Sequence, residues 1–405
     1  MPVNLPPLPE LDAVAGLRCA TVQAGVRKAN RDDLVLFELC EGATVAALFT
    51  RNRFRAAPVR LAERHLDAAT PRYLLVNTGN ANAGTGRQGD ADALACCQAL
   101  ADAAGVAVEQ VLPYSTGVIG ERLPAQRIVD ALPQALDALR ADGWNRAARG
   151  IMTTDTAPKG VSVHVAAAGG ATVTGISKGA GMIRPDMATM LAFVATDAAV
   201  APKLLRRMLI DAVEGSFNRI TVDGDTSTND CVTLVATGAA GTPAIDDPDD
   251  EAALALAAAI AEVCTRLAQA IVRDGEGATR FVTVDVGGAR TAAEALACAY
   301  TIAESPLVKT ALFAGDPNWG RLLAAIGRSG MDDLDVDGVS IRLGDVSICE
   351  QGGVAPTYRE ADGARVMAEA EITISVDLGR GAARERVWTT DLSYDYVKIN
   401  AEYRS

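Results

Sequence analysis

The stretch KGAGMIRPDMATMLAFVATD, residues 178–197, leads from a glycine-containing segment into an unbroken apolar run from Met190 to Val194. Such a run is typical of a buried strand. Thr189 stands directly before the run. Threonine is common at the start of a strand, because its branched side chain suits the pleated surface. Its hydroxyl can also act as a nucleophile when a base lies beside it, so the stretch leaves two interpretations open.

The chain offers few candidates for that base. It has two histidines, His65 and His164, and neither has a second metal ligand at motif spacing, which argues against a zinc site and a Ser-His-Asp triad. A threonine can instead gain a base if the chain cuts itself. Attack of the Thr189 hydroxyl on the Ala188 carbonyl gives an ester, and hydrolysis of that ester frees an α-amine with a pKa of about 7.7 to 8.0. The spacing alone does not show that this happens.

Composition limits the remaining function classes. The chain has 405 residues, of which 49% are hydrophobic and 22% charged, so we expect a globular protein of two or more domains. A net charge of -13 argues against binding to nucleic acid or to anionic membranes and leaves small molecules as partners. The N-terminus has no signal-peptide pattern, and the apolar run 252–261 is too short to span a bilayer, so we expect a soluble, cytoplasmic protein. The eight cysteines are scattered and are expected to be buried thiols.

Apolar runs rich in β-branched residues alternate with alanine-rich helical patterns, which predicts a mixed α/β or α+β fold. The predicted strands include 73–77, 161–166, 191–196, 219–223, 232–237, 280–286 and 371–378. The predicted helices are 90–104, 124–139, 202–214, 251–273 and 292–303, with Pro133 as a break or kink in the second.

Several unusual strings occur in one order along nearly the whole chain. They are VNTGNANAGTG (76–86), STGVIG (115–120), IMTTDTAPK (151–159), SKGAGMIRPDMATML (177–191), TVDGDTSTND (221–230), DGEGATRF (274–281), DPNWGR (316–321) and NAEYRS (400–405). In these strings the chain resembles the bacterial ornithine acetyltransferase, or glutamate N-acetyltransferase, family, whose members cut themselves and work in arginine biosynthesis.

The resemblance implies a DmpA-like fold with sheets between helices and a smaller C-terminal domain. It implies cleavage into an α chain (1–188), which forms the N-terminal part of the main domain, and a β chain (189–405), which completes that domain and carries the smaller one. The two chains are expected to assemble as α2β2 or larger. The resemblance further implies that Thr189 takes the acetyl group from N2-acetylornithine and passes it to L-glutamate in a ping-pong cycle. No cofactor is implied, and the use of acetyl-coenzyme A as a further co-substrate stays open.

The same resemblance implies roles for particular residues. Thr116 and Gly117 match the family's oxyanion hole, with a hydroxyl and a backbone N–H as donors; without the resemblance they read as a turn. Lys178 and Glu276 match substrate-pocket residues, and their alternatives are a solvated lysine and an exposed turn carboxylate. The other matching pocket residues are Thr153 or Thr154, Asn400 and Ser405, of which the last two read otherwise as tail residues.

Two departures and two alternative functions are left open. Asp186 stands where many members have Asn, and Ser405 ends a chain that often ends in Thr. DPNWGR is either a structural turn near the pocket or a segment whose Arg321 anchors a carboxylate or an interface.

An acyl-enzyme that reacts with water would make the chain an aminopeptidase or amidohydrolase. An uncut chain would favour an amino-acid-binding protein.

Overall fold

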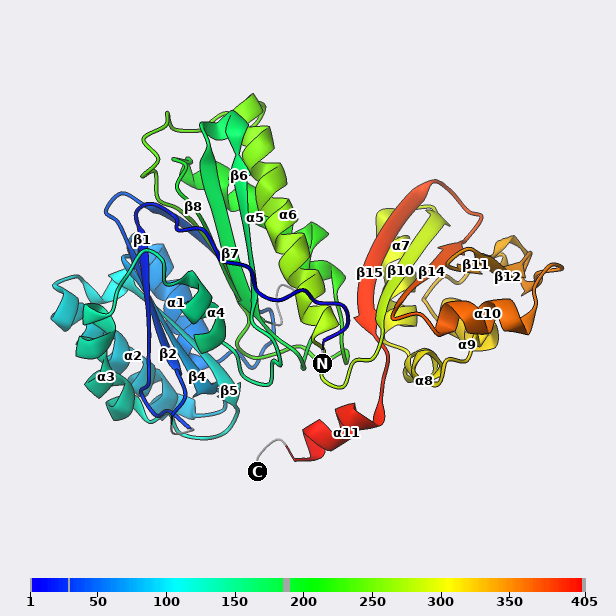
Figure 1. Ribbon diagram of the computed structural model, residues 1–405, viewed down its shortest axis with the longest axis horizontal. Coiled ribbons are helices and arrows are strands. Elements are labelled where there is room, and N and C mark those ends of the chain that lie inside the picture. Colours follow the sequence, from blue (N-terminus) through cyan, green and yellow to red (C-terminus); the bar gives the residue numbers. More distant parts are fainter. Residues whose placement is uncertain (1, 28–29, 185–189, 403–405) are drawn as a thin grey trace.

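The structure, a computed structural model, describes residues 2–27, 30–184 and 190–402. The predicted residues Ala188, Thr189 and Ser405 lie outside the described residues, as does Asp186. The described chain forms three β-sheets with helices on their outer faces, which confirms the predicted mixed α/β class (Figure 1).

Two sheets form the larger unit. The first has the order β1-β2-β4-β5, with β4 and β5 parallel and the other pairs antiparallel. The second has the order β3-β9-β8-β7-β6, with β8 and β9 parallel and the other pairs antiparallel. The first sheet contains β1 (Leu17–Val22), β2 (Leu34–Leu39), β4 (Tyr73–Asn80) and β5 (Val111–Val118). The second contains β3 (Thr44–Phe49), β6 (Lys159–Val165), β7 (Ala171–Lys178), β8 (Leu191–Thr196) and β9 (Cys231–Ala236).

The two sheets pack face to face, and β8 lies in the middle of this arrangement. Phe193 points toward the first sheet, where its ring centroid lies 5.0 Å from that of Phe37 and 5.1 Å from that of Tyr114. Val194, the next residue, belongs to the core on the opposite face of the second sheet. The buried strand predicted from this stretch is confirmed, and because both of its faces are buried its sequence is apolar without alternation.

Helices cover the outer faces of both sheets, so the larger unit has four layers. The core outside the first sheet includes residues of α1 (Ala57–Ala68), α2 (Gly86–Ala104) and α3 (Ala125–Asp137). The core outside the second sheet includes residues of α5 (Pro202–Gly215) and α6 (Glu251–Arg273). The short helix α4 (Trp144–Gly150) contributes Trp144 to the core between the sheets.

The third sheet belongs to a smaller C-terminal unit, at the right of Figure 1, with the order β13-β12-β11-β14-β10-β15. Its strands are β10 (Phe281–Ala289), β11 (Ser340–Leu343), β12 (Val346–Glu350), β13 (Gly353–Val354), β14 (Glu371–Asp377) and β15 (Ala383–Thr390). Its helices are α7 (Ala292–Ala303), α8 (Pro306–Ala314), α9 (Trp319–Gly327) and α10 (Glu360–Met367). The last helix, α11 (Tyr394–Ala401), leaves this unit and runs back beneath the larger one.

All the predicted helices and all but one of the predicted strands are present, with ends shifted by a few residues. Pro133 lies within α3 and does not end it. The predicted strand 219–223 is wrong. Thr221 donates its N–H to the carbonyl of Trp388, whereas Val222 donates to that of Ile183, so this segment bonds to two different neighbours and forms no ladder.

Within the described ranges, α6 is the one helix long and apolar enough to cross a membrane by length and composition. It extends well beyond the apolar run 252–261. Over its most apolar window, 56% of α6 is buried, and it packs against β6, β7 and α5.

A buried lysine lies where the C-terminal unit turns toward α11. Lys309 of α8 is 3% exposed, and its ammonium donates to the hydroxyls of Thr389 and Thr390 at 3.0 and 3.2 Å and to the Thr390 carbonyl. Burial lowers the pKa of Lys309 to about 8, although the nearby carboxylate of Asp391 acts in the opposite direction. The folded protein therefore releases this proton at lower pH than the unfolded chain does.

We predict that this difference makes the protein more stable in mild alkali. Between a folded pKa of about 8 and an unfolded pKa of about 10.4, the unfolded chain binds more protons at this site, so stability rises with pH. From pH 7.5 to 9.5 the gain amounts to about 2 kcal/mol, or about 2 °C in melting temperature for a chain of this length. The measurement is the melting temperature of wild type minus that of Lys309→Met at both pH values. A difference that is constant or falls with pH would contradict the assignment.

Candidate active site

One cavity of about 260 Å³ brings together every described residue that the sequence predicted for the site. Its walls come from the ends of β5 and β7, the loops before β6 and β9, the segment after α6, and α11. Met190 and Leu191, the first described residues after Thr189, also line it. The complete lining is Ala81, Thr116, Gly117, Val118, Ile119, Thr153, Thr154, Lys178, Gly181, Met182, Met190, Leu191, Ser227, Thr228, Asn229, Asp230, Glu276 and Asn400.

Thr116 and Gly117 lie near the carboxyl end of β5, where this strand runs parallel to β4. Gly117 has a φ of 136°, and a Cβ at this position would come within 2.2 Å of the carbonyl carbon of Gly79. A residue with a side chain would therefore push the two strands apart. Asn229 fixes the same region, since its side-chain amide donates to the carbonyl of Ser115 at 2.8 Å. The Thr116–Gly117 segment is thus held in one shape at the cavity wall.

Lys178 is the last residue of β7 and lies opposite Leu191 of β8. It is half-buried, and its ammonium donates to the Thr116 hydroxyl oxygen at 3.1 Å. Burial lowers the pKa of Lys178, and the carboxylates of Asp155 and Asp230 limit that effect. The interpretation as a solvated surface lysine is wrong. Because Lys178 occupies a lone pair of Thr116, the hydroxyl hydrogen can point elsewhere as a polarised donor.

Glu276 is buried, with 8% of its surface exposed, so the interpretation as an exposed turn carboxylate is also wrong. Its backbone N–H donates to the carbonyl of Ala180 at 2.8 Å, and its carboxylate accepts the Asn400 side-chain amide at 2.9 Å. A Cβ on Gly181 would come within 2.4 Å of that carboxyl group, so glycine is required there to admit it. Asn400 thus brings α11 to the cavity.

Thr153 and Thr154 both line the cavity, so the structure does not separate the two predicted alternatives. The N–H of Thr153 donates to the carboxylate of Asp155 at 2.9 Å. DPNWGR does not contribute, since none of its residues lines the cavity. In that segment Asn318 caps the start of α9, and Arg321 donates to the Leu307 carbonyl at 2.8 Å rather than to a carboxylate.

Asp230 is a cavity residue to which the sequence assigned no role. It is 3% exposed, and one of its carboxylate oxygens has no hydrogen-bond partner among residues 2–27, 30–184 and 190–402. Burial raises its pKa well above the ordinary value, although a hydrogen bond from Ser227 and the charge of Lys178 oppose this shift. Such a group can accept a hydrogen bond from an ammonium or amine in the cavity. The signal in the sequence was the polar string STND directly before the buried strand β9.

No three His, Cys, Asp or Glu side chains in the described part of the chain gather closely enough to hold a metal ion. The residues that line the cavity suit acyl chemistry. It has a hydroxyl and a backbone N–H side by side for an oxyanion, a lysine behind that hydroxyl, and a buried carboxylate that can pair with an ammonium.

Comparison with known proteins identifies the chain's relatives. Residues 18–405 match the model of the ArgJ family. The arginine biosynthesis bifunctional protein ArgJ of Pseudomonas fluorescens (strain Pf0-1) is 56% identical over the full length of both chains. That of Psychrobacter arcticus is 56% identical over 97% of each chain. A crystal structure of ArgJ from Bacillus halodurans is 40% identical with a TM-score of 0.50, and the match covers 53% of this chain and 99% of that one. The chain therefore belongs to the ArgJ family, and it is an acyltransferase of arginine biosynthesis.

Proposed function

We propose that the enzyme is a glutamate N-acetyltransferase, which moves the acetyl group of N2-acetylornithine to glutamate through an ester on Thr189. The observation that carries this proposal is the cavity itself, in which Thr116, Gly117, Lys178 and Glu276 face one space that Met190 also lines. Its volume of about 260 Å³ suits an acetylated amino acid better than a larger ligand.

Thr189 becomes active when the chain cuts itself before this residue. Its hydroxyl attacks the Ala188 carbonyl carbon, the peptide C–N bond breaks, and water hydrolyses the resulting ester. The products are a carboxylate on Ala188 and a free α-amine on Thr189. The Bacillus halodurans chain is matched over 99% of its length yet spans 53% of this one, which supports a mature enzyme of two chains.

In the acetyl-transfer cycle, the α-amine of Thr189 accepts the proton of its own hydroxyl while the oxygen attacks the acetyl carbonyl carbon. The positive charge of Lys178 lowers the pKa of this amine and keeps more of it in the basic form. The Thr116 hydroxyl and the Gly117 N–H stabilise the oxyanion. The amide C–N bond then breaks, the amine of ornithine takes the proton, and ornithine leaves. Glutamate reverses these steps, since its neutral amine attacks the ester and leaves as N-acetylglutamate.

Two buried carboxyl groups, Glu276 and Asp230, line the cavity, and burial disfavours the charged form of Asp230 by raising its pKa. We therefore assign the side-chain ammonium of the ornithine portion to Glu276. Asn400 orients this carboxylate through its 2.9 Å hydrogen bond. The cycle needs no cofactor, since donor and product are amides of similar energy. We further propose that the two chains assemble as α2β2 or larger and that the enzyme works in the cytoplasm.

The test is a transfer assay with N2-acetylornithine and glutamate, followed by mass spectrometry of all products. We expect N-acetylglutamate and ornithine in equal amounts, with little acetate. Acetate without N-acetylglutamate would show that water accepts the acetyl group and would make the enzyme an amidohydrolase. Repeating the assay with acetyl-coenzyme A in place of N2-acetylornithine determines whether it is a second acetyl donor.

A further inference from the structure

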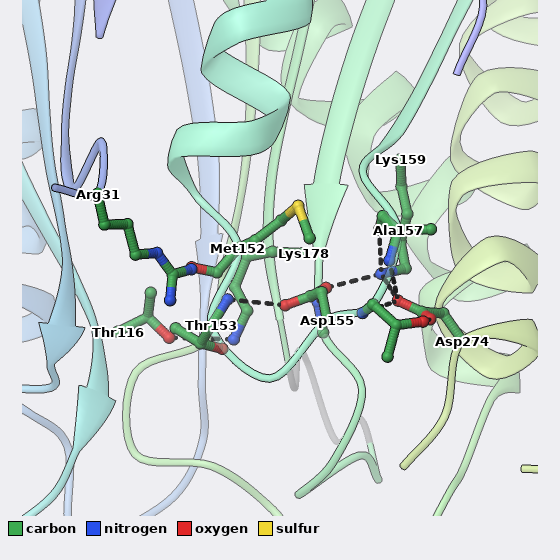
Figure 2. A network of polar contacts seen from close by, with 11 residues as sticks. Arg31, Thr116, Met152, Thr153, Asp155, Ala157, Lys159, Lys178 and Asp274 are labelled. Atoms are coloured by element: carbon green, nitrogen blue, oxygen red, sulfur yellow. Dashed lines mark hydrogen bonds and ion pairs between the residues drawn. The ribbon is translucent and has the colours of Figure 1, made fainter. Parts of the chain in front are cut away.

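A buried cluster of one lysine and two carboxylates lies close to the cavity residues Thr153 and Lys178 (Figure 2). Lys159 is the first residue of β6, Asp155 lies in the loop before it, and Asp274 follows the end of α6. The three side chains are between 0% and 1% exposed, and none of them lines the cavity. The cluster therefore cannot touch a substrate bound there.

Lys159 uses all three of its ammonium hydrogens in this cluster. It donates to Asp155 at 2.7 Å, to Asp274 at 2.6 Å and to the carbonyl of Ala157 at 3.2 Å. Burial alone would lower the pKa of Lys159, but the two carboxylates raise it above the ordinary value. Lys159 and Lys178 together hold the pKa of Asp155 below its usual range in spite of burial. Lys159 and Asp155 are thus both charged at neutral pH.

Each carboxylate also accepts hydrogen bonds from backbone N–H groups in the segments that line the cavity. Asp155 accepts the N–H of Thr153 at 2.9 Å and that of Gly179, next to Lys178, at 2.7 Å. Asp274 accepts two N–H groups of the same loop as Thr153, at 3.0 and 3.2 Å, and stands two residues before Glu276. The cluster therefore joins the segments that present Thr153, Lys178 and Glu276.

We propose that Lys159, Asp155 and Asp274 position the substrate-binding groups, by fixing the segment of Glu276 relative to that of Lys178. This inference rests on the proposed function, in which Glu276 binds the substrate ammonium. Productive geometry requires placement within about 0.5 Å, which charged, fully buried hydrogen bonds can provide. Asp155 and Lys159 precede Ala188 whereas Asp274 follows it, so the cluster also ties together the two chains that self-cleavage produces.

The test variant is Asp274→Asn. The amide oxygen of the new Asn can keep the bonds to Lys159 and to the two N–H groups. In the wild type the Thr156 hydroxyl donates to the other carboxylate oxygen, and in the variant the amide NH2 can donate to that hydroxyl. The pattern of hydrogen bonds is kept, but the bond from Lys159 loses the negative charge of its acceptor and holds the segment of Glu276 less tightly. We expect KM for N2-acetylornithine and Kd for ornithine, measured by calorimetry, to rise about tenfold, while kcat changes less than about threefold.

Arg380→Met is the matched control. Arg380, with 4% of its side chain exposed, pairs with the more exposed carboxylates of Glu294 and Asp333 in the C-terminal unit, so we expect its loss to break two ion pairs without changing KM or Kd. If Asp274→Asn behaves like this control, losing active protein at constant KM and Kd, the cluster only stabilises the fold and the inference is wrong. A wild type without transfer activity would contradict the proposed function instead, and the ornithine Kd would then test the cluster.

Discussion

Replacing Thr189 by alanine is expected to leave a single polypeptide of 42.0 kDa and to lower acetyl transfer at least about 10⁴-fold. Alanine lacks the hydroxyl that attacks the Ala188 carbonyl, so no α-amine is released, and it also lacks the oxygen that carries the acetyl group. Both losses arise from one atom. Intact mass spectrometry and a denaturing gel of wild type and variant measure the first, and the transfer assay measures the second.

Thr189→Ser is the control, because serine keeps a hydroxyl in the same place. We expect it to cut itself and to retain transfer activity, whereas Thr189→Ala does neither. The second chain of the wild type should begin with Thr189. A wild type that stays in one piece would mean that Thr189 is not a nucleophile, and the remaining interpretation would be an amino-acid-binding protein.

The helices and strands that were predicted are those in which the pattern of polar and apolar residues matches their burial in the fold. Helix α6 runs from Glu251 to Arg273 as predicted, because it is bounded by polar residues and is apolar on the faces that pack. β15 is one of several strands that were not predicted from the sequence, and only its second half is buried. In its first half, Arg384 and Arg386 pair with Asp285 on the neighbouring strand, so the stretch reads as polar.

For the site, the family resemblance supplied residues that local patterns could not. Thr116 and Glu276 read as ordinary turn residues until the fold brings them to one cavity. The cluster around Lys159 was missed altogether. Its partner Asp274 is 115 residues away in the chain, and no spacing rule connects two groups at such a separation. Burial is what distinguishes these side chains from surface charges, and burial depends on the tertiary structure.

Thr116→Val is expected to lower kcat by about 10²- to 10³-fold with a smaller change in KM. Valine matches threonine in shape but has no hydroxyl, so the oxyanion keeps the Gly117 N–H and loses its other donor. The loss affects the transition state, where the negative charge develops, more than the bound substrate. Thr116→Ser is the control, since serine retains the hydroxyl donor. Its oxygen can also still accept from the Lys178 ammonium, which lies 3.1 Å from the Thr116 hydroxyl oxygen in the wild type. Steady-state kinetics should be measured on protein shown by mass to be fully cut, so that slower self-cleavage is not mistaken for slower transfer. If Thr116→Val raised KM at unchanged kcat, Thr116 would be binding the substrate in its ground state, and the oxyanion would need a donor other than this hydroxyl.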